Sequence, residues 1–192
     1  MTPTLVNMEH RIRMELFYRL RWDLLADLHD VKIAVGPENE ESVVPLFDQY
    51  CVDEDIANPG LSRIEVCSDE CLRRYENSFD GSPEPDGYRP PPSLIIEAED
   101  GGSVTLKQFV TEVHTYLNEY MDHVKTALRH MYTISANERI FFRRIWARGT
   151  DNDDVRLTVS LLPKLYSASM EQHWASHLHY ARQHKDKRQG LH

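Results

Sequence analysis

The chain has 192 residues, 41% hydrophobic and 28% charged, which is enough apolar material for one sizeable core. Its net charge of -9 argues against a dedicated nucleic-acid-binding protein, because phosphate contacts require a surplus of Lys and Arg on one surface. We find no run of 18 apolar residues, no signal-peptide pattern and only three cysteines, so we expect a cytoplasmic or nuclear protein without a membrane partner.

The N-terminal segment 8–29 predicts a helix, because Ile12, Leu16 and Leu20 recur on one helical face. Part of it, RLRWDLL, alternates nearly as well and is also compatible with a strand. The arginines between these apolar residues are expected on a solvated side, paired with acidic neighbours, and an anion contact is the alternative. They are Arg11, Arg13, Arg19 and Arg21, and the acidic neighbours are Glu9, Glu15 and Asp23.

The next elements are short. Ser68 is expected to open a helix in which Asp69 and Glu70 favour the positive end. Strands are predicted at 31–35 and 63–66 and a short helical piece at 46–50. Glycines and prolines between Phe79 and Pro92 predict an exposed loop with polyproline conformation, which marks a subdomain seam at 79–92 if the chain has two subdomains.

The longest regular pattern runs from Thr105 to Met131 and predicts one helix of about 40 Å at 1.5 Å per residue. Thr105 and Gln108 have the spacing of a capping box at its start. The flanking strands are predicted at 93–97, 138–148 and 155–161, the last two as a hairpin, and a final helix at 167–184 precedes a loose tail. These elements predict a single α+β domain, 1–192, with a long central helix packed on a small antiparallel sheet and flanking N- and C-terminal helices.

The last helix carries three histidines on one side, His173, His177 and His184. The imidazoles of His173 and His177, four residues apart, can share a metal. His184 lies about two helical turns beyond His177 and is too far along the helix to join them at one ion. Glu119 and His123 of the long helix are the best candidates for further ligands. The alternative is that the histidines flank the core, and no metal ligand set is assigned.

Glu119 and His123 are themselves four residues apart, a spacing that suits a general base held by a carboxylate. The same spacing is an ordinary helix-stabilising pair. Cys67 and Cys71 lack the C-x-x-C spacing of zinc or redox sites, and a nucleophilic cysteine would need a nearby histidine.

Four arginines lie on the predicted strand at 138–148. Strand alternation places Arg144 and Arg148 on one face and Arg139 and Arg143 on the other. Arg144 is therefore a candidate for holding a carboxylate or phosphate, and pairing with the aspartates of the following turn is the alternative. The glycine spacing of Rossmann or Walker loops is absent, so no cofactor is predicted.

The segment PPPSLIIEAEDGGSVTLKQFVTEVHTYLNEYMDHV, followed by ERIFFRRIWARG, DVRLTVSLLP and EQHWASHLHYARQ, resembles a group of small uncharacterised fungal proteins over residues 90–184. The shared features are a Pro-rich run, a strand, a long helix, a hairpin and a C-terminal helix. Some such proteins act in specialised metabolism as cofactor-free cyclases, isomerases or tRNA-dependent cyclodipeptide-forming enzymes. The resemblance therefore keeps an enzyme function open and transfers no catalytic residue.

Three functions follow as hypotheses. The first is a small cytosolic enzyme without a conventional cofactor, acting in a groove between the long helix, the hairpin and the last helix through His177, Glu119, His123 and Arg144. The second is a protein-binding adaptor that uses Pro90 to Pro92 and the acidic region 38–56. The third is a His-ligated metal protein. The expected partners are a small-molecule substrate or a protein, with tRNA the one nucleic acid left open.

Overall fold

The computed structural model describes residues 6–77, 87–149, 154–164 and 169–190. Within these ranges, strands form a five-stranded sheet in the order β1-β7-β8-β5-β6 and a three-stranded sheet in the order β2-β3-β4. The predicted α+β class is confirmed, although β5 and β8 pair in parallel and the larger sheet is therefore mixed. Most of the predicted loop at 79–92 lies outside the described residues.

The larger sheet comprises β1 (Val6–Asn7), β5 (Arg63–Ser68), β6 (Leu94–Glu97), β7 (Ile140–Gly149) and β8 (Val155–Pro163). The smaller sheet comprises β2 (Leu20–Arg21), β3 (Lys32–Val35) and β4 (Ser42–Pro45). The α-helices are α1 (Met14–Phe17), α2 (Asp69–Asn77), α3 (Leu106–Glu119), α4 (Met121–Met131) and α5 (Met170–Gln189). Short 3-10 turns are η1 (Leu28–Asp30), η2 (Leu46–Asp48), η3 (Tyr50–Asp53) and η4 (Glu99–Gly101).

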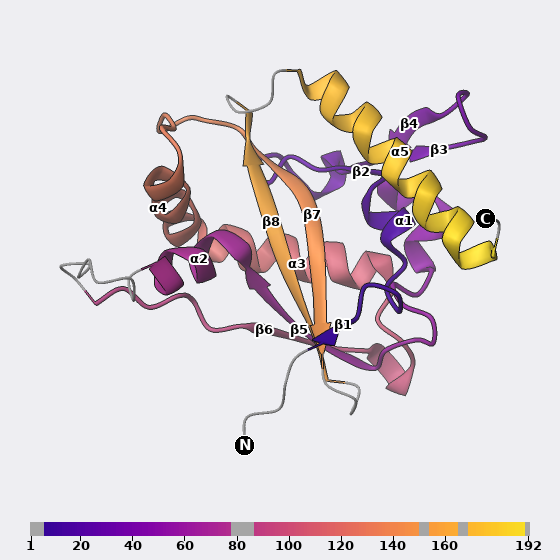
Figure 1. Ribbon diagram of the computed structural model, residues 1–192, viewed down its shortest axis with the longest axis horizontal. Coiled ribbons are helices and arrows are strands. Elements are labelled where there is room, and N and C mark those ends of the chain that lie inside the picture. Colours follow the sequence, from indigo (N-terminus) through magenta and orange to yellow (C-terminus); the bar gives the residue numbers. More distant parts are fainter. Residues whose placement is uncertain (1–5, 78–86, 150–153, 165–168, 191–192) are drawn as a thin grey trace.

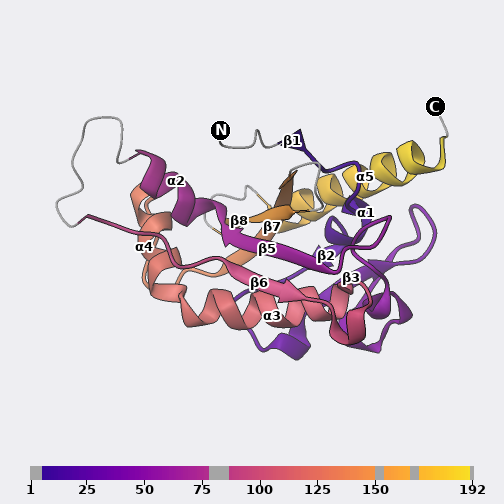
Figure 2. The same cartoon turned by 90° about the horizontal axis from the view of Figure 1, so that it is seen from below.

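The core lies between α3 and one face of the five-stranded sheet. Phe109, Val110 and Val113 of α3 are fully buried in one apolar cluster with the inward-facing residues of β5, β7 and β8. Burial of each such side chain stabilises the fold by about 2 kcal/mol. In Figure 1 α3 passes behind β7 and β8, and Figure 2 shows α3 on one side of the sheet and α5 on the other.

The predicted single helix at 105–131 is wrong in one respect, because it is interrupted at Tyr120 (φ -101°, ψ 22°). α3 packs on the sheet, whereas α4 turns away and packs beside α2 (Figure 1). The two halves of the apolar stripe therefore face different partners. At the start of α3, Gln108 N donates to Thr105 Oγ1 at 3.2 Å, as the capping pattern predicts, while the Gln108 side chain donates to Glu97 O and Glu112.

The predicted first helix at 8–29 is also wrong, since only the single turn α1 is helical. Leu20 pairs with Ile33 across β2 and β3, so the strand alternative for RLRWDLL is the correct one there. Leu20, Trp22 and Leu24 are all buried at alternate positions. Pairing outweighs the helical pattern because it buries these residues and satisfies their backbone groups together, Leu20 on β3 and Trp22 and Leu24 on β7.

The strands predicted at 31–35, 63–66, 93–97, 138–148 and 155–161, the hairpin and the helix after Ser68 are confirmed within a few residues. The segment predicted to be helical at 46–50 forms two 3-10 turns. The final helix is confirmed, but the predicted loose tail is wrong, because α5 continues to Gln189. Gly190 ends it in the left-handed conformation, with φ 67°.

A bulge in β7 changes the predicted arrangement of its arginines. The pairing with β8 shifts between Phe142 and Arg144, so Phe142 and Ile145 both enter the core although they are three residues apart. The charges of Arg143 and Arg144 both act on His177 of α5. Because Phe142 and Ile145 both enter the core, the strict alternation on which the predicted opposite faces of these two arginines depend is interrupted at the bulge.

Truncating Phe109 tests the α3 contact. We expect Phe109→Ala to lower the free energy of unfolding by about 3–5 kcal/mol, because a fully buried aromatic ring leaves a cavity. Urea denaturation followed by circular dichroism measures the change. Lys107→Ala, at an exposed position of the same helix, should change it by less than about 0.5 kcal/mol. Equal effects of the two substitutions would contradict the assignment of this face to the core.

Candidate functional site

The four residues predicted to share a groove fall into two separate places. Glu119 and His123 are exposed at the junction of α3 and α4, and the His123 ring lies near Tyr88, with centroids 6.0 Å apart. His177 belongs to α5, which lies on the other side of the sheet (Figure 2), and the charge of Arg144 acts on it. The predicted groove between α3, the hairpin and α5 is not formed, because the sheet separates the two helices. Catalytic roles for these residues stay predictions.

His177 of α5 packs against Tyr18, the residue that follows α1. Its side chain is 6% exposed, and its ring contacts Tyr18 edge-to-face with centroids 5.3 Å apart. Burial, together with the positive charges of His173, Arg143 and Arg144, lowers the pKa of His177 to about 3. The imidazole is therefore neutral at physiological pH, and its position is that of a packing residue in the contact between α5 and α1.

His173 and His177 are close enough to share a ligand, since their ring centroids are 4.0 Å apart. Neither Nε2 of His173 nor Nδ1 of His177 has a hydrogen-bond partner. Among the described residues, however, no group of three or more His, Cys, Asp or Glu side chains could hold a metal ion. Glu119 and His123, the predicted additional ligands, lie across the sheet.

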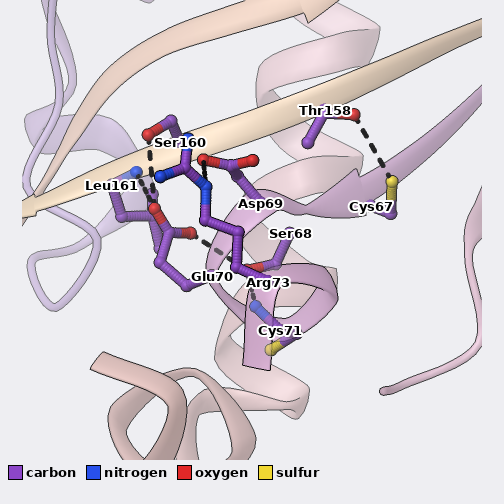
Figure 3. Close-up of polar contacts among 9 residues, drawn as sticks. All are labelled: Cys67, Ser68, Asp69, Glu70, Cys71, Arg73, Thr158, Ser160 and Leu161. Atoms are coloured by element: carbon purple, nitrogen blue, oxygen red, sulfur yellow. Dashed lines mark hydrogen bonds and ion pairs between the residues drawn. The ribbon is translucent and has the colours of Figure 1, made fainter. Parts of the chain in front are cut away.

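Glu70 is a buried carboxyl whose partners are neutral donors. It is 2% exposed, and Oε1 accepts from Leu161 N at 2.7 Å and Ser160 Oγ at 3.3 Å. Oε2 accepts from Ser68 Oγ at 3.1 Å, and Figure 3 shows the carboxyl group between α2 and β8. Because β5 ends at Ser68, Glu70 takes the place of a neighbouring strand as the acceptor for Leu161.

Burial raises the pKa of Glu70 to about 7, in spite of the hydrogen bond from Leu161 that favours the ionised form. A pKa near neutrality would suit an acid–base catalyst. Both oxygens are nevertheless occupied, Oε1 by donors of β8 and Oε2 by Ser68 at the end of β5, so the arrangement explains Glu70 as the group that joins α2 to β8. The sequence indicated only its place near the helix start, because the contact with β8 joins residues 91 apart.

The three cysteines are buried and unpaired. Burial raises the pKa of each thiol, which keeps the thiols protonated at neutral pH. Cys67 Sγ lies beside Thr158 of β8, whereas Cys71 lies in the first turn of α2 (Figure 3). None of the three therefore has the lowered pKa of a nucleophilic cysteine.

A cavity of ≈570 Å³ lies between α1, β3, η3 and the last turns of α5. We call it the α1–α5 groove. Its apolar lining includes Leu16, Ile33 and Val35, and Tyr50, 84% exposed, also lines it. Its ionisable lining residues are Arg13, Glu15, Arg19, Cys51, Glu54, Lys185 and Arg188. The cationic side chains outnumber the carboxylates by two, although the whole chain is strongly acidic.

Glu15 organises the charges of this groove. It is 7% exposed, and its Oε1 accepts from Arg13 Nε at 3.1 Å and from Arg188 Nη1 at 2.5 Å. Arg13 also pairs with Glu54, with Nη1 and Oε2 2.5 Å apart. Arg19 and Lys185 line the same cavity without a carboxylate partner in the described part of the chain. The groove therefore has two fixed arginines and two unneutralised cations.

Part of this arrangement is predicted by the sequence. The pairing of Arg13 with Glu15 is confirmed, but Glu15 is buried and not on a solvated helix side. The contact of Arg188 with Glu15 joins residues 173 apart, so no local pattern could indicate it. The alternative of an anion contact by these arginines stays a prediction.

Comparisons with protein-family models, with curated proteins and with solved structures find no match to this chain. The resemblance to small fungal proteins therefore stays a prediction. Among the described helices, none is both long enough and apolar enough to cross a membrane.

The buried position of Glu70 predicts a specific pH dependence of stability. Between its ordinary pKa of 4.5 and about 7, the folded protein holds a proton that the unfolded chain has released. The contribution of Glu70 to stability is therefore complete below the unfolded pKa and falls as pH rises through this window, by about 3 kcal/mol at 1.36 kcal/mol per pKa unit.

Glu70→Gln should abolish this contribution, because the amide stays neutral and can still accept from Leu161 N. Urea denaturation of wild type and variant at several pH values measures the difference in unfolding free energy, which should shift in favour of the variant as pH rises. Glu76→Gln, at an exposed position of α2, should show no such trend. A pH-independent difference for Glu70→Gln would contradict the raised pKa.

Proposed function

We propose that the protein binds a small anionic ligand, bearing a carboxylate or phosphate, in the α1–α5 groove. The observation that carries this proposal is the charge arrangement there. Arg13 and Arg188 are held on one oxygen of buried Glu15, while Arg19 and Lys185 have no carboxylate partner in the described structure.

Fixed arginines suit anion recognition. The guanidinium group presents several N–H donors in one plane and binds carboxylate or phosphate through two parallel hydrogen bonds. Because Glu15 already orders Arg13 and Arg188, a ligand loses less conformational entropy on binding than it would with free side chains. The lining by Leu16, Ile33 and Val35 suits a ligand with a short apolar body.

The cavity volume supports a small molecule in preference to a macromolecule. At ≈570 Å³ it lies within the range of roughly 300–1,000 Å³ that is typical of small-ligand pockets. The large exposed apolar residues, which an adaptor surface would gather, belong to different elements: Val6, Leu25, Tyr50, Tyr75, Ile95 and Tyr180. Binding in the groove is thus better supported than an apolar docking face.

Whether the bound molecule is also converted stays a prediction from the sequence. The groove offers Glu54 as a carboxylate, engaged by Arg13, and Cys51 as a thiol whose pKa is raised by burial. This setting favours binding over nucleophilic catalysis. Incubation of any ligand found with the protein, followed by product analysis, tests the enzyme hypothesis separately.

Removing Arg19 should weaken binding without disturbing the fold, because its guanidinium makes no ion pair in the described part of the chain. Isothermal titration calorimetry with phosphate, succinate and citrate, and with uncharged succinamide, should show heat for at least one anion and none for the amide. We expect Arg19→Gln to raise the Kd of that anion about tenfold, the equivalent of one lost charge-assisted hydrogen bond.

Arg148→Gln provides the matched control, since it removes the same charge from β7, outside the groove. A second readout is alkylation of Cys51 at alkaline pH, resolved from Cys67 and Cys71 by peptide mass spectrometry, which the bound anion should slow. If none of the anions binds, or if Arg19→Gln and Arg148→Gln act equally, the groove is not the anion site.

A further inference from the structure

A second positively charged surface lies on the side of the five-stranded sheet that α3 does not cover. We call it the arginine face and define it by four residues of β7: Arg143, Arg144, Trp146 and Arg148. Arg144, Trp146 and Arg148 occupy alternate positions and therefore point to the same side. The bulge adds Arg143, whose charge acts on Arg144 and on His173 of α5.

The arginines of this face form no ion pair within the described residues, although the charge of Asp69 acts on Arg144. Arg143, Arg144 and Arg148 have no carboxylate within ion-pair distance in the described ranges. Neighbouring arginines, in contrast, are paired: Arg156 with Glu65 at 3.0 Å, Arg73 with Asp69 at 2.9 Å and Arg139 with Asp23 at 2.7 Å. In a chain with 31 acidic and 22 basic residues, three adjacent unpaired arginines are a marked local concentration of positive charge.

Trp146 lies between the charges. The Cζ atom of Arg144 is 3.7 Å from the Trp146 ring centroid, a cation–π contact that holds both side chains. Trp146 and Arg148 also line a cavity of ≈290 Å³ together with Asp69 and Thr158. This cavity shares no lining residue with the α1–α5 groove. An aromatic wall beside polar side chains suits a planar heterocycle whose edge forms hydrogen bonds.

Arg144 Nε supplies an independent sign of a missing partner. The atom is buried and forms no hydrogen bond. Leaving a buried donor without an acceptor costs about as much free energy as one hydrogen bond contributes. A ligand that supplies an acceptor for Arg144 Nε would therefore stabilise the complex. Arg143 carries the same charge as Arg144 and repels it. A bound anion would reduce this repulsion between the two guanidinium groups.

We infer that the arginine face binds a single-stranded nucleic acid, with phosphates on Arg143, Arg144 and Arg148 and an unpaired base against Trp146. Arg144 and Arg148 are four residues apart on a strand, about 13 Å at 3.3 Å per residue, too far for one phosphate to bridge. A polymer with repeated phosphates can contact both. Stacking on an aromatic side chain also requires an unpaired base, which a duplex does not offer.

Other polyanionic partners fit less well. Neither β7 nor β8 carries one of the large exposed hydrophobic residues that would insert into a lipid surface. An acidic peptide would use the charges but would gain nothing specific from Trp146 and the cavity beside it. The overall charge of -9 repels nucleic acid at long range, so we expect weak binding with a strong dependence on salt.

Fluorescence anisotropy of a fluorescein-labelled oligouridine of about twelve nucleotides tests the inference. Binding should be detectable at low salt and should weaken as salt rises, with a log–log slope of about -2 for three phosphate contacts to a single strand. Arg148→Gln should weaken binding and reduce the magnitude of that slope by about 0.7. Arg19→Gln, the groove variant, should leave both unchanged.

Three competitors decide the partner class: an RNA hairpin duplex of equal charge, polyglutamate, and unlabelled oligouridine. Only oligouridine should compete well and quench tryptophan fluorescence, and Trp146→Leu should remove the quenching. If Trp146→Leu does not fold, the wild type and Arg148→Gln are compared instead. Oligouridine should then quench the fluorescence of the wild type and not that of Arg148→Gln. The inference is overturned if oligouridine does not bind at low salt, if polyglutamate or the duplex competes equally, or if Arg19→Gln weakens binding as much as Arg148→Gln.

Discussion

The contact between the apolar face of α3 and one face of the five-stranded sheet is the interaction on which the other features of the structure depend. Phe109, Val110 and Val113 are fully buried there, and β5, β7 and β8 contribute their inward residues to the same cluster. Once one face of the sheet is committed to the core, the residues at alternate positions must face outward. The arginine face is a direct consequence of this division.

Two buried carboxyl groups connect elements around this core in different ways. Glu70 accepts from neutral donors of β8 and joins α2 to the strand at the point where β5 ends. Glu15 accepts from two arginines, one after β1 and one near the end of α5. Both oxygens of Glu70 accept hydrogen bonds, whereas Glu15 accepts on Oε1 and its buried Oε2 has no partner among the described residues. Of the two, Glu15 lines a described cavity and Glu70 does not. Glu15 therefore bears on ligand binding, whereas Glu70 bears on stability.

The last helix links packing to the proposed binding site. Its first half packs through Trp174 on Phe141 and through His177 on Tyr18, with ring centroids 6.2 and 5.3 Å apart. Its second half is held by ion pairs and brings Lys185 and Arg188 to the α1–α5 groove. The groove therefore exists only when α5 is docked, and its charge depends on residues at both ends of the chain.

Local patterns in the sequence determined the α+β class, the hairpin of β7 and β8, the helix after Ser68 and the final helix, because side-chain periodicity and capping act over a few residues. They also indicated that Arg13 and Glu15 pair. Tertiary packing decided the strand at Leu20, the break at Tyr120 and the bulge at Arg143, since each depends on which partner covers the segment. It also separated His177 from Glu119 and joined Arg188 to Glu15, because periodicity shows which side of an element is apolar but not which distant element will cover it.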